Sequence, residues 1–140
     1  MKNILVTGGC GFIGSHVVLK LLEKGYHVTI LDSNINSSKK IIDKLRLLSK
    51  QNTSINFGEL FFVKGDIRDS EILEKIFSEK KFEKTVVDTV IHLAGLKSVK
   101  ESFINPIDYW DVNVNGSINL LKKMIKYECF KIVFSSSATV

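Results

Sequence analysis

The stretch that decides the fold is residues 3–32, which read NILVTGGCGFIGSHVVLKLLEKGYHVTILD. It begins with an apolar run, passes through a glycine-rich turn and an amphipathic segment, and ends with a second apolar run that Asp32 closes. The turn contains the pattern Gly9-x-Gly11-x-x-Gly14. Alone, this pattern is weak evidence. Between a strand pattern and a helix pattern, with an acid after the next strand, it predicts a dinucleotide-binding βαβ unit.

Each glycine of this turn has a physical role in such a unit. Gly8 and Gly9 permit the tight turn out of the strand. Gly11 lets the backbone approach a pyrophosphate, and Gly14 lets the helix pack closely. Free N–H groups at the start of the helix then bind the phosphates, and Asp32 accepts hydrogen bonds from the adenosine ribose. The alternative is a structural turn with an incidental acid, which the order of the surrounding elements disfavours.

Strand and helix patterns alternate along the whole chain. Continuous apolar runs, typical of buried parallel strands, cover residues 4–7, 27–31, 60–63, 89–94 and 131–135. Helical periodicity covers residues 12–24, 38–50, a segment from Asp69 onward, and about 106–127. We therefore predict one α/β domain over residues 1–140, a Rossmann-like doubly wound parallel sheet of strand order 3-2-1-4-5, with the chain ending after the fifth strand.

Two of the predicted helices carry start signals. Asp69 is a good N-cap residue, and Asn105 precedes Pro106 at the first helical position. The helix from Pro106 also carries an apolar stripe, formed by Ile107, Trp110, Val114, Leu121 and Ile125. This stripe fits two interpretations, packing on the sheet or pairing with a second copy of the chain.

The composition narrows the function classes. The chain is 44% apolar and 25% charged, as ordinary soluble globular proteins are, and it has no run near the ~20 apolar residues of a membrane helix. A strand directly after Lys2 argues against a signal peptide. The net charge of +5 comes from lysines scattered among acids, which disfavours nucleic-acid binding. Cys10 and Cys129 are isolated, so we expect reduced thiols in a cytoplasmic protein and no metal site.

Ligands in open α/β sheets bind beyond the carboxyl ends of the strands, so the residues just past each strand are the site candidates. Asp66 is either a turn residue or an adenine contact, since spacing alone fits both. Lys97 places a cation where phosphates or the nicotinamide ribose would lie. His92, inside the fourth strand, is more typical of a packed core histidine. Asn113, inside the long helix, is either surface polarity or a cofactor contact.

Several blocks of sequence together carry a family resemblance. They are Thr7-Gly-Gly-Cys-Gly-Phe-Ile-Gly-Ser-His16, Gly65-Asp-Ile-Arg-Asp69, Ile91-His-Leu-Ala-Gly-Leu-Lys-Ser-Val99, Glu101-Ser102, Pro106, Asn113-Val-Asn-Gly116 and Phe134-Ser-Ser-Ser-Ala-Thr-Val140. Over its whole length the chain resembles the NAD-binding N-terminal portion of the UDP-glucose 4-epimerase family, which are extended short-chain dehydrogenase/reductases. The related sugar dehydratases usually carry different blocks after the fourth and fifth strands.

The resemblance implies a cofactor, NAD, and a set of residues that hold it. Those residues are Gly8, Gly11, Phe12, Ile13, Gly14, Asp32, Ser33, Asn34, Asn36, Ser37, Asp66, Ile67, Leu93, Ala94, Gly95, Leu96, Lys97, Asn113 and Ser135. At Ser33 the family more often has Asn. Ser137 matches the catalytic serine, which hydrogen-bonds the sugar hydroxyl that is oxidised. The implied reaction inverts C4 of UDP-glucose or UDP-galactose through a 4-keto intermediate, in a cytoplasmic homodimer.

Two expected parts of the family pattern are missing from the sequence. The family's Tyr-x-x-x-Lys helix follows the serine strand, whereas this chain ends at Val140. The one match to that spacing, Tyr127-Glu-Cys-Phe-Lys131, joins a helix to a strand at the opposite edge of the sheet. We therefore expect the substrate domain to be absent and the 140 residues alone to be inactive. We also expect residues 131–135 to form an edge strand that is prone to self-association. The alternatives are a non-catalytic nucleotide-binding module and the first part of a nucleotide-sugar dehydratase or reductase.

Overall fold

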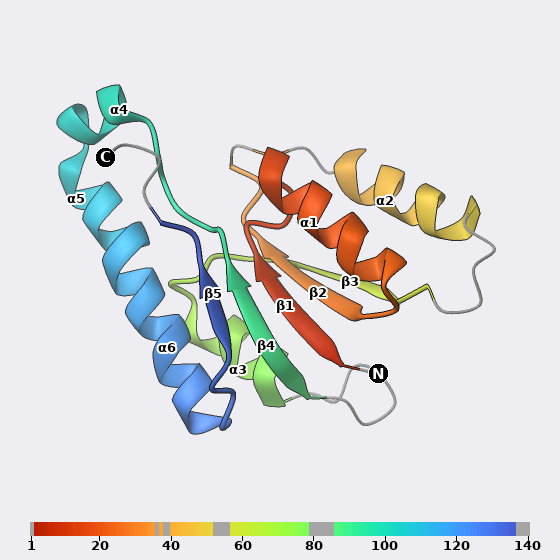
Figure 1. The fold of residues 1–140 in the computed structure, drawn as a ribbon. Helices are drawn as coiled ribbons and strands as arrows, with labels where there is room; N and C mark the ends of the chain where they lie inside the picture. The colour runs from red at the N-terminus through yellow and green to blue at the C-terminus, as the bar shows by residue number, and fades with distance from the viewer. Residues whose placement is uncertain (1, 36, 38–39, 52–56, 79–85, 137–140) are drawn as a thin grey trace.

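The computed structural model describes residues 2–35, 37, 40–51, 57–78 and 86–136. Its five strands form one parallel sheet in the order β3-β2-β1-β4-β5, which confirms the predicted fold class (Figure 1). The strands are β1 (Asn3–Thr7), β2 (His27–Asp32), β3 (Leu60–Lys64), β4 (Val87–His92) and β5 (Ile132–Phe134). The helices are α1 (Phe12–Glu23), α2 (Lys40–Gln51), α3 (Ser70–Ser78), α4 (Val99–Ile104), α5 (Pro106–Trp110), a π-helical turn η1 (Asp111–Asn115) and α6 (Gly116–Lys126).

Helices cover both faces of the sheet, and each face has its own apolar core. Alternate residues of β1 point to opposite faces, so Ile4 and Val6 lie in one core and Leu5 lies in the other. Helices α1 and α2 lie over the first face, and α3 and α6 over the second (Figure 1). This two-sided cover explains why the strands read as continuous apolar runs instead of alternating ones.

The close packing of α1 depends on Gly14. A Cβ at this position would lie 2.3 Å from the Gly8 carbonyl oxygen, a distance that no side chain can occupy. Gly8 itself has a φ of +69°, in the left-handed region that favours glycine. The structure therefore confirms that Gly8 forms the tight turn and that Gly14 allows close packing of the helix. The backbone that Gly14 packs against is that of the glycine loop, at Gly8 and Gly9.

Helix α3 begins as the sequence predicts. The Asp69 carboxylate accepts hydrogen bonds from the backbone N–H groups of Glu71 and Ile72, at 2.9 and 3.1 Å. This satisfies two donors that have no partner inside the helix. The apolar side of α3 then buries Leu73, Ile76 and Phe77.

The helical region from residue 99 onward differs from the prediction in three ways. A separate helix, α4, precedes it, capped by Ser98, whose hydroxyl accepts from the Glu101 N–H. Asn105 is the N-cap residue of α5 and Pro106 begins the helix, as predicted, but the Asn105 side chain makes no capping hydrogen bond. The predicted single helix also contains the π-helical turn η1 between α5 and α6.

The apolar stripe of this region faces away from the sheet. Residues Gly116, Leu120 and Met124 of α6 are buried against the second core. Ile107, Trp110, Leu121 and Ile125 are exposed by 81, 65, 43 and 67%. Of the two interpretations of the stripe, packing on the sheet is thereby wrong for these four residues.

Strand β5 is an edge strand, as predicted. It pairs with β4 alone among the described strands, and all three of its residues are exposed. Across the described residues, none of the helices combines the length and the apolar character that crossing a bilayer requires.

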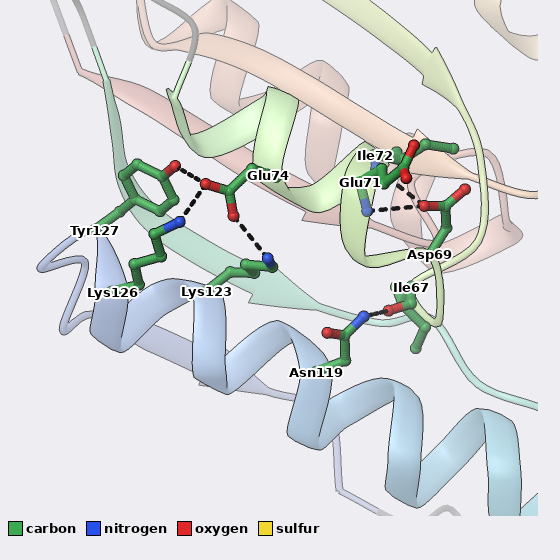
Figure 2. Close-up of polar contacts among 9 residues, drawn as sticks. All are labelled: Ile67, Asp69, Glu71, Ile72, Glu74, Asn119, Lys123, Lys126 and Tyr127. Carbon is green, nitrogen blue, oxygen red and sulfur yellow. Dashed lines mark hydrogen bonds and ion pairs between the residues drawn. The ribbon is translucent and has the colours of Figure 1, made fainter.

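The junction of α6 with β5 holds the Tyr127-to-Lys131 match, and its tyrosine has a structural role. The Tyr127 hydroxyl, Lys126 and Lys123 all contact the carboxylate of Glu74 on α3, Lys123 at 2.6 Å (Figure 2). These contacts, that of Lys123 foremost, lower the pKa of Glu74 to about 2. Because this junction precedes β5, it lies at the amino edge of the sheet, which confirms the position predicted for this match.

Candidate functional site

The carboxyl edge of β1 and β2 is organised by Asp32. Its Oδ2 accepts a hydrogen bond from the backbone N–H of Cys10 in the glycine loop, at 2.9 Å. Its Oδ1 accepts from the Asn34 N–H at 2.8 Å and from the Ser37 hydroxyl at 2.9 Å. The Asp32 residue is 9% exposed. Both oxygens are thus oriented by the protein, and the carboxylate joins the end of β2 to the turn that follows β1.

The start of α1 presents unused donors at the same edge. Gly11 is the N-cap residue and provides no side-chain cap. Among the described residues, the backbone N–H groups of Phe12, Ile13 and Gly14 donate to no acceptor. No acidic residue stands in the first turn of this helix. The partial positive charge of a helix N-terminus is therefore left for an external anion.

The thiol of Cys10, inside the glycine loop, is unreactive. The residue is buried, and burial together with the nearby Asp32 charge raises the pKa of its thiol to about 12. Because the thiolate is the reactive form, this thiol is inert near neutral pH.

The turn after β3 projects a second carboxylate, that of Asp66. The Arg68 side chain donates from Nε to Oδ1 at 3.0 Å and from Nη2 to Oδ2 at 2.8 Å. These bonds hold the pKa of Asp66 below its usual range, so it is ionised. Arg68 also donates from Nη1 to Asp111 in η1, at 2.9 Å. The Gly65 N–H donates to the Asp32 carbonyl, which places this turn beside Asp32.

The loop after β4 is held by Asn113 from η1. The Asn113 Oδ1 accepts from the Leu96 N–H at 2.8 Å, and its Nδ2 donates to the Leu96 carbonyl at 2.9 Å. A Cβ on Gly95 would lie 3.1 Å from the same Oδ1, so the loop backbone passes close to this amide. Asn113 therefore has a structural role, which excludes the interpretation as mere surface polarity. It fixes the loop that carries Gly95, Leu96 and the exposed Lys97.

His92 lies at the centre of a continuous hydrogen-bonded chain. Its Nδ1 is 2.6 Å from the Thr7 hydroxyl and its Nε2 is 2.9 Å from the Ser117 hydroxyl. The Ser117 hydroxyl donates to the Asn113 carbonyl at 2.6 Å, so it accepts from His92 Nε2–H. Nδ1 then accepts from Thr7, whose oxygen also receives the Ala94 N–H at 3.3 Å. Burial lowers the pKa of His92 to about 4, which keeps the ring neutral.

The structure brings most of the predicted residues to one edge of the sheet. The glycine loop, residues 32–34, Ser37, the Asp66–Ile67 turn and the loop from Leu93 to Lys97 all follow the carboxyl ends of β1 to β4. Ser135 follows β5, and its N–H donates to the His92 carbonyl at 3.1 Å. Asn36 and Ser137 lie outside the described residues. The supporting residues Thr7, Arg68, Asp111, Ser117 and Asn119 were not predicted from the sequence. The last three lie in a segment where polar and apolar residues alternate, so their polarity alone did not distinguish them.

The protein is a Rossmann-like α/β protein, defined by a parallel sheet of this strand order with a glycine loop and a fixed acid at its carboxyl edge. The chain belongs to the family described as GDP-mannose 4,6 dehydratase, whose model matches residues 5–140. Among curated proteins, it resembles UDP-glucose 4-epimerases. It is 51% identical to the enzyme of that name from Neisseria meningitidis serogroup A, covering 100% of this chain and 38% of that protein.

Solved structures agree with this similarity. UDP-glucose 4-epimerase from Bifidobacterium longum, in complex with NAD+ and UDP, superposes with a TM-score of 0.86 at 40% identity, over 99% of this chain and 38% of that one. The corresponding enzyme from Stenotrophomonas maltophila, with bound NAD and formylated UDP-arabinopyranose, gives a TM-score of 0.84 at 39% identity, over 100% of this chain and 38% of that one. The chain therefore spans a little over a third of the length of these relatives.

The lowered pKa of His92 predicts a loss of stability in weak acid. Between pH 6.5 and 4 the unfolded state binds a proton at this histidine and the folded state does not, so the free energy of unfolding falls as the pH falls. The full loss across this window is about 3 kcal/mol. Denaturant unfolding at a series of pH values measures it. His92→Gln, which cannot titrate, should flatten this part of the profile.

The acids contribute in a different pH range. Asp66, Glu74 and Asp111 have lowered pKa values, so the stability they add is lost only below ordinary carboxyl pKa values. If the free energy of unfolding fell equally steeply with pH in the wild type and in His92→Gln between pH 6.5 and 4, His92 would not be the group responsible for the loss of stability.

Proposed function

We propose that residues 1–140 form the NAD-binding N-terminal domain of a UDP-glucose 4-epimerase, whose substrate domain lies outside these residues. The observation that carries the proposal is the carboxyl edge of β1 and β2. There, unused N–H groups at the start of α1 stand beside a carboxylate oriented by the Cys10 N–H. A helix N-terminus suits a pyrophosphate, and an oriented carboxylate suits a pair of ribose hydroxyls. The solved relatives crystallised with NAD support the choice of cofactor.

The proposed roles follow the edge of the sheet from strand to strand. Gly8, Gly11, Phe12, Ile13 and Gly14 present backbone to the pyrophosphate, and Asp32 with residues 33–37 (Ser33, Asn34, Asn36 and Ser37 among them) holds the adenosine ribose. Asp66 and Ile67 meet the adenine. Leu93, Ala94, Gly95, Leu96, Lys97 and Ser135, with Asn113 behind them, line the nicotinamide side. Asn36 enters this proposal from the family resemblance alone.

In the whole protein, bound NAD would supply a hydride acceptor for C4 of a UDP-sugar. The residues of this chain bind and orient the reactants. Lys97 places a positive charge at the nicotinamide end, and Ser137, assigned from the resemblance, hydrogen-bonds the C4 hydroxyl. The proposed partners are UDP-glucose and UDP-galactose, with no nucleic acid or membrane, in a cytoplasmic protein. A non-catalytic nucleotide-binding module is the weaker proposal.

One further candidate is a dehydratase, because the matching family model bears the description of a GDP-mannose 4,6 dehydratase. The relatives near 50% identity favour epimerisation. The whole protein that contains these residues should convert UDP-galactose to UDP-glucose and leave GDP-mannose unchanged, which chromatography of the products measures. Dehydration of GDP-mannose without epimerisation would reject the epimerase proposal.

We expect this chain to bind NAD in preference to NADP. The Asp32 carboxylate would face the 2′-phosphate of NADP at close range in a site that is largely buried, and like charges repel there. Calorimetric titration should give an affinity for NADP about tenfold weaker than that for NAD, or weaker still. Asp32→Asn keeps the shape of the side chain and removes its charge, so it should reduce the difference between the two affinities. Tighter binding of NADP by the wild type would reject the cofactor assignment.

The proposed homodimer uses the exposed apolar face of α4, α5 and α6. This face comprises Phe103, Ile104, Ile107, Trp110, Leu121 and Ile125, each more than a third exposed. Exposed apolar patches of this kind mark association surfaces. Strand β5 is the competing surface, because among the described strands it pairs with β4 alone and stands at the edge of the sheet.

We expect sedimentation of this chain to show a concentration-dependent dimer whose interface is the exposed apolar face of α4, α5 and α6. Ile125→Lys should yield monomers at concentrations where the wild type is dimeric, because it places a charge in the apolar face. Lys122→Glu, also exposed on α6, is the matched control and should leave the dimer intact. If Val133→Lys in β5 dissociates the assembly while Ile125→Lys does not, association runs through the sheet edge instead.

A further inference from the structure

The turn Asp66–Arg68 is held by the helical segment 111–119 at three points. The Asn119 side chain donates from Nδ2 to the Ile67 carbonyl at 2.9 Å (Figure 2). Asp111 accepts a hydrogen bond from Arg68 Nη1 at 2.9 Å, and Arg68 in turn donates to both carboxylate oxygens of Asp66. The Ile67 side chain, 4% exposed, packs where a Cβ on Gly116 would lie, 2.7 Å from its Cδ1.

This support fixes a hydrogen-bond acceptor and a hydrogen-bond donor on neighbouring residues of the turn. The Asp66 Oδ2 accepts one hydrogen bond from Arg68, so it retains capacity for a further donor. The backbone N–H of Ile67 donates to no acceptor among the described residues. An acceptor next to a donor is complementary to the edge of adenine, which offers the 6-amino group as donor and N1 as acceptor. Hypoxanthine offers the reverse pattern.

We propose that Asn119 and Asp111 are positioning residues for base recognition: they hold Ile67 and Arg68 so that the Asp66 carboxylate and the Ile67 N–H meet the adenine edge. The inference rests on the proposed NAD function and adds two residues that touch no cofactor themselves. Asn119 fixes the carbonyl of the Ile67–Arg68 peptide and thereby restrains the residue whose N–H meets the base, and Asp111 orients the guanidinium that holds Asp66. Together they make this base site selective for a 6-amino purine.

A purely structural role, holding α3 against α6, is served elsewhere on the same helix. Lys123 contacts Glu74 at 2.6 Å with its side chain 15% exposed, one turn beyond Asn119 (Figure 2). Loosening the helix pair at Lys123 therefore serves as a matched control, because it disturbs the α3–α6 packing without touching the backbone of Ile67.

The test compares binding of NAD with binding of nicotinamide hypoxanthine dinucleotide, which differs only in the base. The wild-type chain should bind NAD about 10–100-fold more tightly, the range for one or two hydrogen bonds that include a charged acceptor. Asn119→Leu and Asp111→Asn should each reduce this ratio by roughly tenfold, chiefly by weakening NAD. Lys123→Met should leave the ratio unchanged, even where its unfolding midpoint falls.

The outcomes separate this inference from the function on which it rests. A wild type that binds neither dinucleotide overturns the proposed function. A wild type that binds both equally overturns the adenine role of Asp66, and the inference with it. If the wild type discriminates while both variants keep its ratio, or if Lys123→Met loses the ratio equally, Asn119 and Asp111 are not positioning residues. Should Asn119→Leu fail to fold, Asp111→Asn, a partly exposed substitution, decides the question.

Discussion

The arrangement of the carboxyl edge depends on the contact between Gly14 and the carbonyl of Gly8. The absence of a side chain at Gly14 lets the first turn of α1 rest directly on the loop that leaves β1. At that separation the N–H groups of the first turn open onto the end of the sheet, and the Cys10 N–H reaches Asp32. One missing methyl group thus links the loop, the helix and the neighbouring strand. Bulk at this position would have to be accommodated by moving backbone, which costs far more than moving a side chain.

The opposite side of the same edge is organised by polar side chains instead of close backbone packing. Within residues 111–119, four side chains reach four different places: Asp111 meets Arg68, Asn113 meets Leu96, Ser117 meets His92 and Asn119 meets Ile67. These contacts connect the turn after β3, the end of β4 and the loop that follows it. Because these bonds join one helical segment to three neighbouring parts of the edge, that segment fixes their relative positions.

Much of the fold could be predicted because its signals are local. Continuous apolar runs marked all five strands, and the glycine spacing with Asp32 marked the first βαβ unit. The differences arise where neighbouring segments of the helical region change what one residue or one stripe does. Asn105 precedes Pro106 as predicted, yet it also ends α4, and its side chain makes no capping hydrogen bond. The stripe from Ile107 to Ile125 has helical spacing, but the π-helical turn changes which residues face the sheet.

The candidate site shows the same division. Asp32 was predictable because its place in the motif is fixed by the strand and the turn. The role of Asn113 was not, because its partner, the Leu96 backbone, lies across the fold and leaves no trace in the spacing of side chains. Asp66 was ambiguous for a related reason: a carboxylate after a strand suits a turn, and its orientation depends on Arg68 and on Asp111, 43 residues further along.

The π-helical turn at Asp111–Asn115 has a consequence for how this segment can change. Each residue of a regular helix rotates the following side chains by about 100°, so the widened turn determines the rotational phase of everything after it. A π-helical turn holds one residue more than the α-helical turn that it replaces. Deleting one residue within Asp111–Asn115 would therefore restore a regular helix and leave Gly116, Leu120 and Met124 facing their core, whereas a deletion inside α6 would rotate every side chain beyond it by about 100°. Changes of length are thus open to the π-helical turn in a way that α6 does not allow.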